Sequence, residues 1–498
     1  MEKLYKLVLL LLLVGSILVG EVSAQTGDLP RSTPEEQGVS SKAVHTYFDS
    51  LMALPNTEIH GVMVMRHGKV IGEFYPEPFK AEYQHTMYSC SKTFVSAAVG
   101  LAIAENRLRL DDRVAPFFAE YLPDTISDNL AAMTIHDLLI MGSGIIPSGR
   151  LRVENGEWIK NYLGKHVKEP SAAFEYDSMC TYLLAAILQK VMGVNVLEYL
   201  QVKLFNEMNI TQADWEISAE GYITGGWGMH IQCETMAKFG QLLLNKGEWN
   251  GKQLLPESWV EQMLTGHVKF RGGGYGYQLW LCEYPNTYRC DGAFGQYILL
   301  MPDQDMVVAI TECTMGSGVP QRRLVWDLIF PTLTDSPKKA TSEYSKLVKA
   351  QKGYKFPVIK GSATSPISSS VIGKRMVLAD NRLGWSTIEF TTVGGELKLR
   401  VYTTDNDCYD VVCGNGEWIT TWIDANPPYS VRYYNRYNGL DGKFAVAASY
   451  GWVDKSKLDV KLHYVNWISS LLLKIDFDSN EIEIKENYSA QPFKVKIL

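Results

Sequence analysis

Ser89 and Lys92 are the residues whose types and spacing point most directly to chemistry. They lie three positions apart, just before a run of small and apolar residues, 95–104, that predicts a buried helix. Positions i and i+3 share a helix face, so we expect the Lys92 amine to reach the Ser89 hydroxyl. Burial lowers the pKa of a lysine, and a neutral amine can take the proton of a serine hydroxyl that is otherwise a weak nucleophile. The spacing therefore predicts acyl transfer through a covalent intermediate on Ser89.

Tyr176 is a second candidate for this chemistry. It lies in the segment 174–178, before a helix predicted to begin near Thr181. In a loop facing the Ser89 helix its hydroxyl could take or return a proton, with a pKa lowered by Lys92. The alternative is an ordinary packing aromatic, one of 27 tyrosines. No G-x-S-x-G nucleophile elbow and no histidine-rich signature accompany Ser89, so a Ser-His-Asp triad has no support.

Composition excludes several other classes of function. A net charge of −7 gives no reason to expect nucleic acid or an anionic membrane surface as a partner. The eight cysteines are scattered without a C-x-x-C pair, so we predict no metal site and no cofactor. Cys408 and Cys413 lie close together in a polar stretch, which predicts a local disulfide, whereas Cys90 and Cys180 lie in apolar contexts typical of buried free thiols.

The first 24 residues have the anatomy of a secretory signal peptide. Residues 1–6 are basic, 7–20 are apolar and 22–24 are small. We expect cleavage before Gln25 and export to the periplasm or the extracellular space. A membrane anchor is the alternative, but the apolar stretch is short for a span and no second span of about twenty apolar residues follows.

The mature chain divides into two predicted domains, because it is longer than a single core normally supports. In residues 25–335, strands predicted at 61–66 and 69–74 and again at 275–281, 295–301 and 306–311 enclose a mainly helical stretch from Ser89 to about Gly266, and a last helix is predicted at 321–330. This order predicts the α+β class, with an antiparallel sheet and a large helical insertion.

Residues 336–370 are rich in Lys, Ser and Pro and predict a linker. Residues 371–498 then alternate like strands, which predicts a small all-β barrel or sandwich without an acid/base or metal constellation. The predicted strands are Ser386 to Thr392, Glu396 to Tyr402, Ser430 to Arg436, Lys443 to Tyr450, Leu458 to Tyr464, Leu471 to Phe477 and Glu481 to Lys485.

Taken together, these segments resemble the class C β-lactamase-like serine hydrolases, a superfamily that also holds DD-peptidases, bacterial carboxylesterases and aminohexanoate-oligomer hydrolases. The resemblance spans roughly residues 31–334. Its motifs are Ser89-Cys90-Ser91-Lys92-Thr93-Phe94, Tyr176-Asp177-Ser178, Thr134 to Leu139 with Gly142-Ser143-Gly144, Gly225-Gly226-Trp227-Gly228 and Tyr275 to Trp280. It implies a β-lactamase/DD-peptidase-like fold in which Ser89 is acylated, Lys92 accepts its proton, and Tyr176 relays protons to the leaving group and the deacylating water.

The chain departs from the family pattern in two places. Ser178 replaces the usual asparagine, and a hydroxyl has a shorter reach than an amide. The Lys-Thr-Gly motif is absent before Gly292, where Arg289, Cys290 and Asp291 stand instead. In β-lactamases that lysine meets the substrate carboxylate, so its loss favours a different acyl substrate. The backbone amide near Cys290 could still join that of Ser89 as an oxyanion hole.

The expected substrate-binding set is accordingly Ser178, Cys290, Gly292, Trp158, Tyr277 and Arg289. Trp158 and Tyr277 enter it as possible pocket-lining aromatics, with core packing as the alternative. The favoured function is an exported serine hydrolase acting on a small-molecule ester, amide or peptide. The alternative is a penicillin-binding or β-lactamase-like protein that is acylated by a β-lactam or cell-wall peptide and turns it over slowly. The presence of both Lys92 and Tyr176, which deacylation needs, favours the enzyme.

Overall fold

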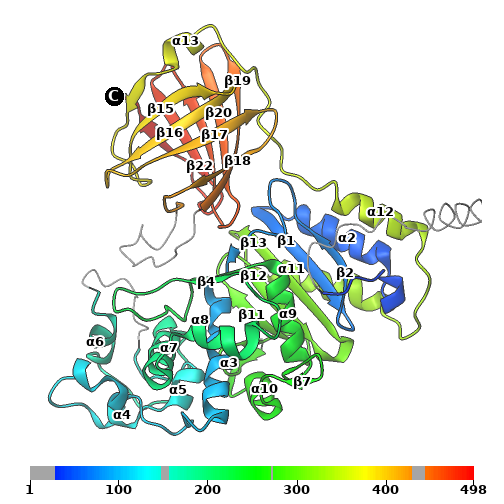
Figure 1. The fold of residues 1–498 in the computed structure, drawn as a ribbon, viewed down its shortest axis with the longest axis vertical. Coiled ribbons are helices and arrows are strands. Elements are labelled where there is room, and N and C mark those ends of the chain that lie inside the picture. The colour runs from blue at the N-terminus through cyan, green and yellow to red at the C-terminus, as the bar shows by residue number, and fades with distance from the viewer. Residues whose placement is uncertain (1–28, 147–155, 271–272, 429–443) are drawn as a thin grey trace, which may run out of the picture.

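The computed structural model describes residues 29–146, 156–270, 273–428 and 444–498. The predicted signal peptide and the strand predicted at 430–436 lie outside these residues. Over the described ranges, the chain forms a mixed α and β part built on one large sheet, followed by an all-β part near the C-terminus (Figure 1). The predicted α+β fold class is confirmed.

The large sheet of the first part is antiparallel and joins segments from both ends of that part. Among the described residues its strand order is β2-β1-β13-β12-β11-β10-β9-β8. The predicted hairpin forms β1 and β2, and β13 returns along β1 with Val64 opposite Val308. The strands are β1 (Thr57–Arg66), β2 (Lys69–Phe74), β8 (Val268–Phe270), β9 (Gly273–Tyr275), β10 (Trp280–Leu281), β11 (Tyr288–Gly292), β12 (Gln296–Met301) and β13 (Met306–Thr314).

Alternation along β1 separates two hydrophobic cores. Val62 and Val64 belong to a core that includes the apolar face of α2 (Ser41–Met52). Met63 and Met65 belong to the core that includes α3 (Ser91–Ala104), α7 (Ser178–Met192) and α9 (Cys233–Leu244). Successive strand residues point to opposite faces, so the sheet has helices on both sides. Gly240 lets α9 approach closely, since a β-carbon there would lie 2.6 Å from a side-chain carbon of Val307.

The helical stretch between β3 (His85–Thr86) and β8 carries most of the first part's helices (Figure 1). The predicted cap at Thr134 is present, as a capping box with Asp137 that starts α5. Helices on the two faces and in this stretch are α2 (Ser41–Met52), η2 (Tyr88–Cys90), α3 (Ser91–Ala104), η3 (Ala115–Tyr121), α4 (Asp128–Ala132), α5 (Ile135–Leu139), α6 (Trp158–Leu163), α7 (Ser178–Met192), α8 (Val196–Leu200), η4 (Gln201–Phe205), α9 (Cys233–Leu244), α10 (Glu257–Leu264), α11 (Val319–Leu324), η6 (Val325–Ile329) and η7 (Phe330–Thr332). Two small sheets add β3 (His85–Thr86), β4 (Ala213–Trp215), β5 (Met229–Ile231), β6 (Glu248–Trp249) and β7 (Lys252–Gln253).

The C-terminal part is a sheet curled on itself, which we call the barrel. Its path runs from β14 to β23, and the ends meet because Leu378 bridges to Ile497 and the Leu498 N–H donates to the Val377 carbonyl at 2.9 Å. Its interior is filled by aliphatic and aromatic side chains. The strands are β14 (Arg375–Val377), β15 (Trp385–Val393), β16 (Glu396–Thr403), β17 (Cys408–Asn415), β18 (Ile419–Ile423), β19 (Phe444–Asp454), β20 (Lys457–Tyr464), β21 (Ser470–Asp476), β22 (Glu481–Glu486) and β23 (Phe493–Lys496).

Two expectations about the C-terminal half are corrected. The stretch 336–370 contains the helix α12 (Ser342–Gln351), whose Leu347 is buried against the core under α2, and the short helix α13 (Ser368–Val371) begins at its end. The disulfide predicted between Cys408 and Cys413 is absent, and both thiols are free. They lie five residues apart on the single extended strand β17, about 16 Å of chain, which is too far for a bridge.

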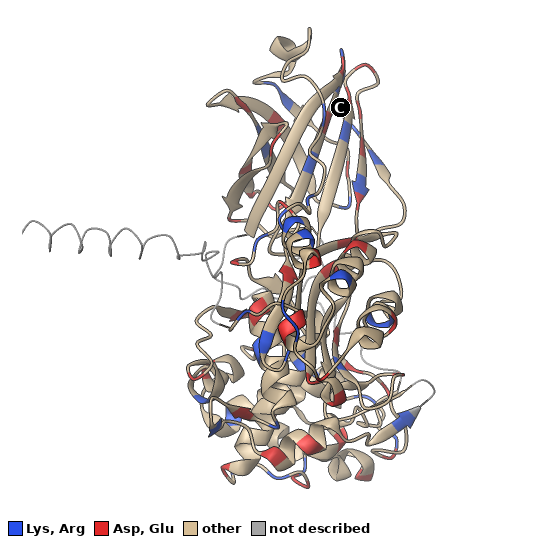
Figure 2. Cartoon of the chain, turned by 90° about the vertical axis from the view of Figure 1, so that its right-hand side faces the viewer, with Lys and Arg blue, Asp and Glu red and all other residues tan. Residues whose placement is uncertain are grey.

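Lys and Arg residues are interspersed with Asp and Glu residues along both parts (Figure 2). Across the described ranges, no single helix is long and apolar enough to cross a membrane. Helix α7 and the helical stretch Val196–Phe205 meet the length and composition test only as a pair bent by 69°.

Candidate active site

Ser89 lies in the single turn η2, which leads directly into α3. Its side chain is partly exposed, whereas Cys90 and the first three turns of α3 are buried. The turn is fixed to β5 at both ends, because Met87 N–H donates to the Met229 carbonyl at 2.8 Å and Met229 N–H donates to Ser91 Oγ at 3.1 Å. The hydroxyl of Ser89 is thus presented from a rigid base toward solvent.

Lys92 meets Ser89 as the spacing predicts. Its Nζ lies 2.9 Å from Ser89 Oγ, 2.9 Å from Ser178 Oγ and 2.5 Å from the carbonyl oxygen of Gly226. The side chain is 1 % exposed. Desolvation by this burial lowers the pKa of Lys92 from 10.5 to about 7. A substantial fraction of Lys92 is therefore neutral near pH 7 and able to accept the Ser89 proton.

Tyr176 lies beside this pair, with the Lys92 ammonium 4.9 Å from the centre of its ring. The sequence-based expectation of a lowered pKa is wrong: desolvation raises the pKa of Tyr176, although a hydrogen bond with Ser89 opposes the rise. The phenol is consequently protonated at neutral pH and suited to donate a proton. Its ring packs against Trp280 and Tyr275, at centroid distances of 5.2 and 6.1 Å.

Ser178 is the first residue of α7 and reaches Lys92 despite its short side chain. Asp177 caps the helix by accepting a hydrogen bond from the Met179 N–H at 2.9 Å, which fixes the backbone direction at the neighbouring Tyr176 and Ser178. Gly226 packs directly on Ser178, because a β-carbon at position 226 would lie 2.8 Å from Ser178 Cβ. The close approach of these backbones brings the Gly226 carbonyl onto Lys92.

The strand β11 supplies the remaining predicted residues. Gly292 lies against the nucleophile turn, since a β-carbon there would be 2.3 Å from the Met87 carbonyl. Cys290 points to the buried side, and its pKa is raised by desolvation. Arg289 is engaged by Asp291 at 2.7 Å and lies over the ring of Trp280 at 5.4 Å. The positive charge of Arg289 is therefore already balanced by the carboxylate of Asp291.

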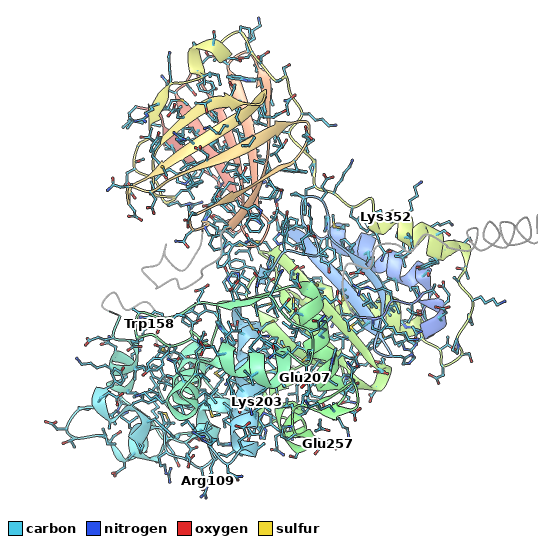
Figure 3. All side chains as sticks on the ribbon, viewed as in Figure 1. Arg109, Trp158, Lys203, Glu207, Glu257 and Lys352 are labelled. Carbon is cyan, nitrogen blue, oxygen red and sulfur yellow. The ribbon has the colours of Figure 1, made fainter. Side chains whose placement is uncertain are left out.

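The expectation that Trp158 and Tyr277 line the pocket is corrected, since both side chains are 2 % exposed and pack in the core. Trp158 begins α6 in the helical region, where Figure 3 labels it, and its ring packs against Tyr182 at 5.3 Å. Tyr277 stacks on His267 at 4.1 Å. The core-packing alternative holds for both aromatics.

Residues that the sequence did not single out complete the arrangement. The Gly226 carbonyl contacts Lys92, and Trp280 packs against Tyr176. Both belong to segments that carry the resemblance, yet a backbone oxygen and a ring contact leave no residue-type signal. Among the residues that the structure describes, no group of three His, Cys, Asp or Glu side chains is arranged to hold a metal ion.

Known proteins resemble this chain in sequence and in fold. The model of the beta-lactamase family matches residues 46–327. A 6-aminohexanoate-dimer hydrolase from Paenarthrobacter ureafaciens is 24 % identical over 312 residues, which cover 56 % of this chain and 78 % of the relative. A class C beta-lactamase structure has a TM-score of 0.50 at 16 % identity, over 59 % of this chain and 97 % of that one. EstCE1, a hydrolase with promiscuous acyltransferase activity, gives a TM-score of 0.48 at 18 % identity, over 57 % and 98 %.

Proposed function

Since the chain belongs to the beta-lactamase family, we propose that it is a serine hydrolase that cleaves a neutral ester or small amide through an acyl-enzyme on Ser89. The observation that carries the proposal is the contact of Ser89 with a buried Lys92 whose pKa is lowered to about 7. A surface lysine would be charged at neutral pH and could not serve as the base.

In the proposed acylation, neutral Lys92 takes the Ser89 proton while Oγ bonds to the substrate carbonyl carbon. The carbonyl oxygen becomes an oxyanion, for which we propose the backbone N–H groups of Ser89 and Cys290 as donors. Collapse of this intermediate breaks the bond to the leaving group, which takes a proton from Tyr176. Lys92 then returns its proton to the phenolate, so the site is restored for attack by water on the acyl-enzyme.

The surroundings of Ser89 favour an uncharged substrate. The charge of Arg289 is balanced by Asp291, and aromatic rings of Tyr176, Trp280 and Tyr275 gather beside the reacting pair. A substrate carboxylate would have to compete with Asp291 for the guanidinium. This argues against the alternative that the protein binds β-lactams or cell-wall peptides. It supports cleavage of esters or amides, as in the ester- and amide-cleaving relatives. We also propose that the protein is exported, as its first 24 residues predict.

The test compares the wild-type chain with Ser89→Ala and Lys92→Ala. A fluorophosphonate should label wild type at the tryptic peptide that holds Ser89, and p-nitrophenyl butyrate should be hydrolysed faster than a chromogenic cephalosporin. Ser89→Ala should abolish both activities, and Lys92→Ala should lower the rate at least about a hundredfold. Labelling that persists in Ser89→Ala would remove Ser89 from the mechanism. Acylation of Ser89 by the cephalosporin with little turnover would favour the slow-turnover alternative, and efficient cephalosporin turnover would indicate a β-lactamase.

A further inference from the structure

One turn of the barrel, residues 465–469 between β20 and β21, packs on the base of the nucleophile turn η2. Trp467 of this turn is 2 % exposed and packs edge-on against Phe444 of the barrel at 5.7 Å. On its other side it contacts the first part of the chain. Its ring lies 6.1 Å from that of Tyr88 and stacks on His230 at 5.1 Å.

Tyr88 directly precedes the nucleophile and has a left-handed backbone, with φ at +43°. A side chain with a β-carbon disfavours this conformation, so neighbouring structure must hold it there. The Tyr88 ring is held between Trp467 and Phe294, the latter at 5.5 Å. Its carbonyl accepts the Ser91 hydroxyl at 2.6 Å, which ties the same residue to the start of α3.

His230 provides a second contact between Trp467 and the base of the site. It lies in β5, the strand that fixes the nucleophile turn through Met229. Its Nε2 lies 3.9 Å from a carboxylate oxygen of Glu216, and the other carboxylate oxygen accepts the indole N–H of Trp227 at 3.3 Å. Trp227 follows the glycine whose carbonyl holds Lys92. One barrel side chain therefore packs against the supports of both reacting residues.

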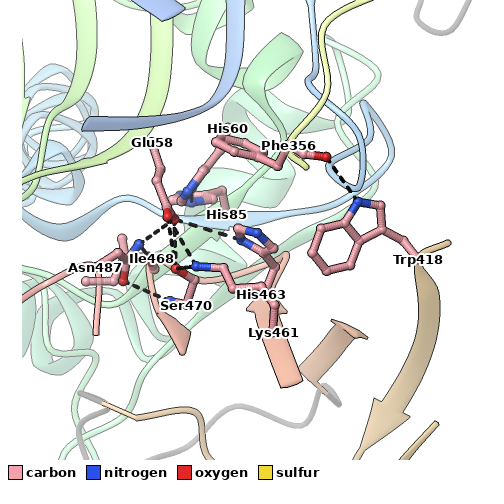
Figure 4. Close-up of polar contacts among 10 residues, drawn as sticks. All are labelled: Glu58, His60, His85, Phe356, Trp418, Lys461, His463, Ile468, Ser470 and Asn487. Carbon is pink, nitrogen blue, oxygen red and sulfur yellow. Dashed lines mark hydrogen bonds and ion pairs between the residues drawn. The ribbon is translucent and has the colours of Figure 1, made fainter. Parts of the chain in front are cut away.

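A partly buried polar cluster fixes this turn in place (Figure 4). The carboxylate of Glu58, on β1, accepts hydrogen bonds from Ser470 Oγ at 2.9 Å and Asn487 Nδ2 at 2.8 Å, and Lys461 Nζ lies 3.5 Å away. Desolvation works against the charged form, but Lys461, His60 and the two hydrogen bonds outweigh it and lower the pKa of Glu58. Lys461 and Ser470 lie on the two strands that flank the turn carrying Trp467.

We propose that the barrel is part of the catalytic machinery, and that Trp467 is a positioning residue that holds Tyr88 in its left-handed conformation and so sets Ser89 against Lys92. The inference rests on the proposed function of Ser89 as the nucleophile. The indole N–H of Trp467 is buried and, among the described residues, has no hydrogen-bond partner. Ring packing is therefore the contribution of this side chain, and Trp467→Phe should retain most of it.

The experiment measures the second-order rate of fluorophosphonate labelling per folded molecule of the full chain. Trp467→Ala should slow labelling about tenfold, on the scale by which a left-handed backbone is disfavoured in a residue other than glycine. Trp467→Phe should stay within about threefold of wild type. Trp452→Ala is the matched control, since Trp452 is a buried barrel tryptophan that packs on Phe477 within the barrel, and its loss should leave the rate unchanged.

A second background isolates the role of Tyr88. Glycine adopts left-handed backbone freely, so in a Tyr88→Gly chain the further change Trp467→Ala should slow labelling less than about twofold. Equal rates for Trp467→Ala and wild type, or the same tenfold loss in both backgrounds, would overturn the inference. If Trp467→Ala does not fold, Trp467→Leu takes its place in both backgrounds.

Amide hydrogen exchange over residues 87–91 gives a readout that does not depend on Ser89 being reactive. Exchange there should be faster in Trp467→Ala than in wild type and unchanged in Trp452→Ala. Unchanged exchange in Trp467→Ala would refute the positioning role. Failure of wild-type labelling at Ser89 would instead refute the proposed function, while the exchange comparison would still decide whether Trp467 orders the turn.

Discussion

Changing the pH from 9 to 5 directly tests whether Lys92 is the base. Burial lowers the pKa of Lys92 from 10.5 to about 7. The neutral fraction is then about 90 % at pH 8, about half at pH 7, about a tenth at pH 6 and about a hundredth at pH 5. The rate of Ser89 acylation should follow these fractions, with a plateau above about pH 8 and a tenfold fall per pH unit below about pH 6.

The assay is fluorophosphonate labelling at Ser89, quenched at timed intervals and quantified by mass spectrometry from pH 5 to pH 10. A reagent without a titrating group keeps the profile specific to the enzyme. Tyr176→Phe is the control, because it leaves Lys92 in place and should keep the inflection near pH 7. A rate that climbs steadily to pH 10 would mean that Lys92 keeps its ordinary pKa. A flat profile between pH 5 and pH 8 would mean that another group is the base.

The same pKa makes Lys92 costly to the fold. Its folded-state pKa is lower than its unfolded-state value, so the unfolded chain binds more protons between about pH 7 and pH 10.5, and this residue's contribution to stability rises with pH through that window. Below pH 7 the penalty is at most about 5 kcal/mol. Lys92→Met removes it but leaves the buried Gly226 carbonyl without this donor, at about 1–3 kcal/mol. We expect an inactive variant that urea unfolding finds about 2–4 kcal/mol more stable at pH 6–7. At pH 10 the penalty is below about 1 kcal/mol, so the variant should be no more stable than wild type there. A variant less stable than wild type at pH 6 would contradict this.

Three further substitutions test single parts of the site. Tyr176→Phe should slow cleavage of an anilide about a hundredfold, with little change in Tm. It should slow cleavage of a p-nitrophenyl ester, whose leaving group needs no proton, less than about tenfold. A lower Tm with normal activity per folded molecule would make Tyr176 a packing residue. Ser178→Ala removes an acceptor that favours charged Lys92, so the inflection of the labelling profile should move below pH 7, and an unmoved inflection would mean that this contact has no effect on Lys92. Arg289→Ala should leave cephalosporin hydrolysis as poor as in wild type; efficient hydrolysis that this change abolishes would restore the β-lactamase interpretation.

The parts of the fold and site that the sequence predicted are those with local causes. The i, i+3 spacing of Ser89 and Lys92 defines a shared helix face whatever packs around it, and Nζ lies 2.9 Å from Oγ. The hairpin of β1 and β2 and the cap at Thr134 follow equally from nearby residues. In the C-terminal half, the strands β15, β16 and β19 to β22 were predicted from alternation, whereas β14, β17, β18 and β23 were not.

The missed features depend on contacts between segments far apart in the chain. A carbonyl such as that of Gly226 has no residue-type signal, because every residue carries one. The raised pKa of Tyr176 results from burial, which opposes the influence of a neighbouring cation and is not visible in a motif. The contact between Trp467 and Tyr88 joins positions 379 residues apart, in two parts of the chain that are predicted from the sequence to be separate domains.

The geometry around Lys92 explains why the asparagine of the family pattern can be a serine in this chain. Lys92 Nζ has a 2.5 Å contact with the Gly226 carbonyl, which is available because Gly226 lies against Ser178 with no room for a β-carbon. The Gly226 carbonyl therefore holds the amine from one side while Ser178 Oγ holds it from another. A longer amide at position 178 is not needed to fix the base.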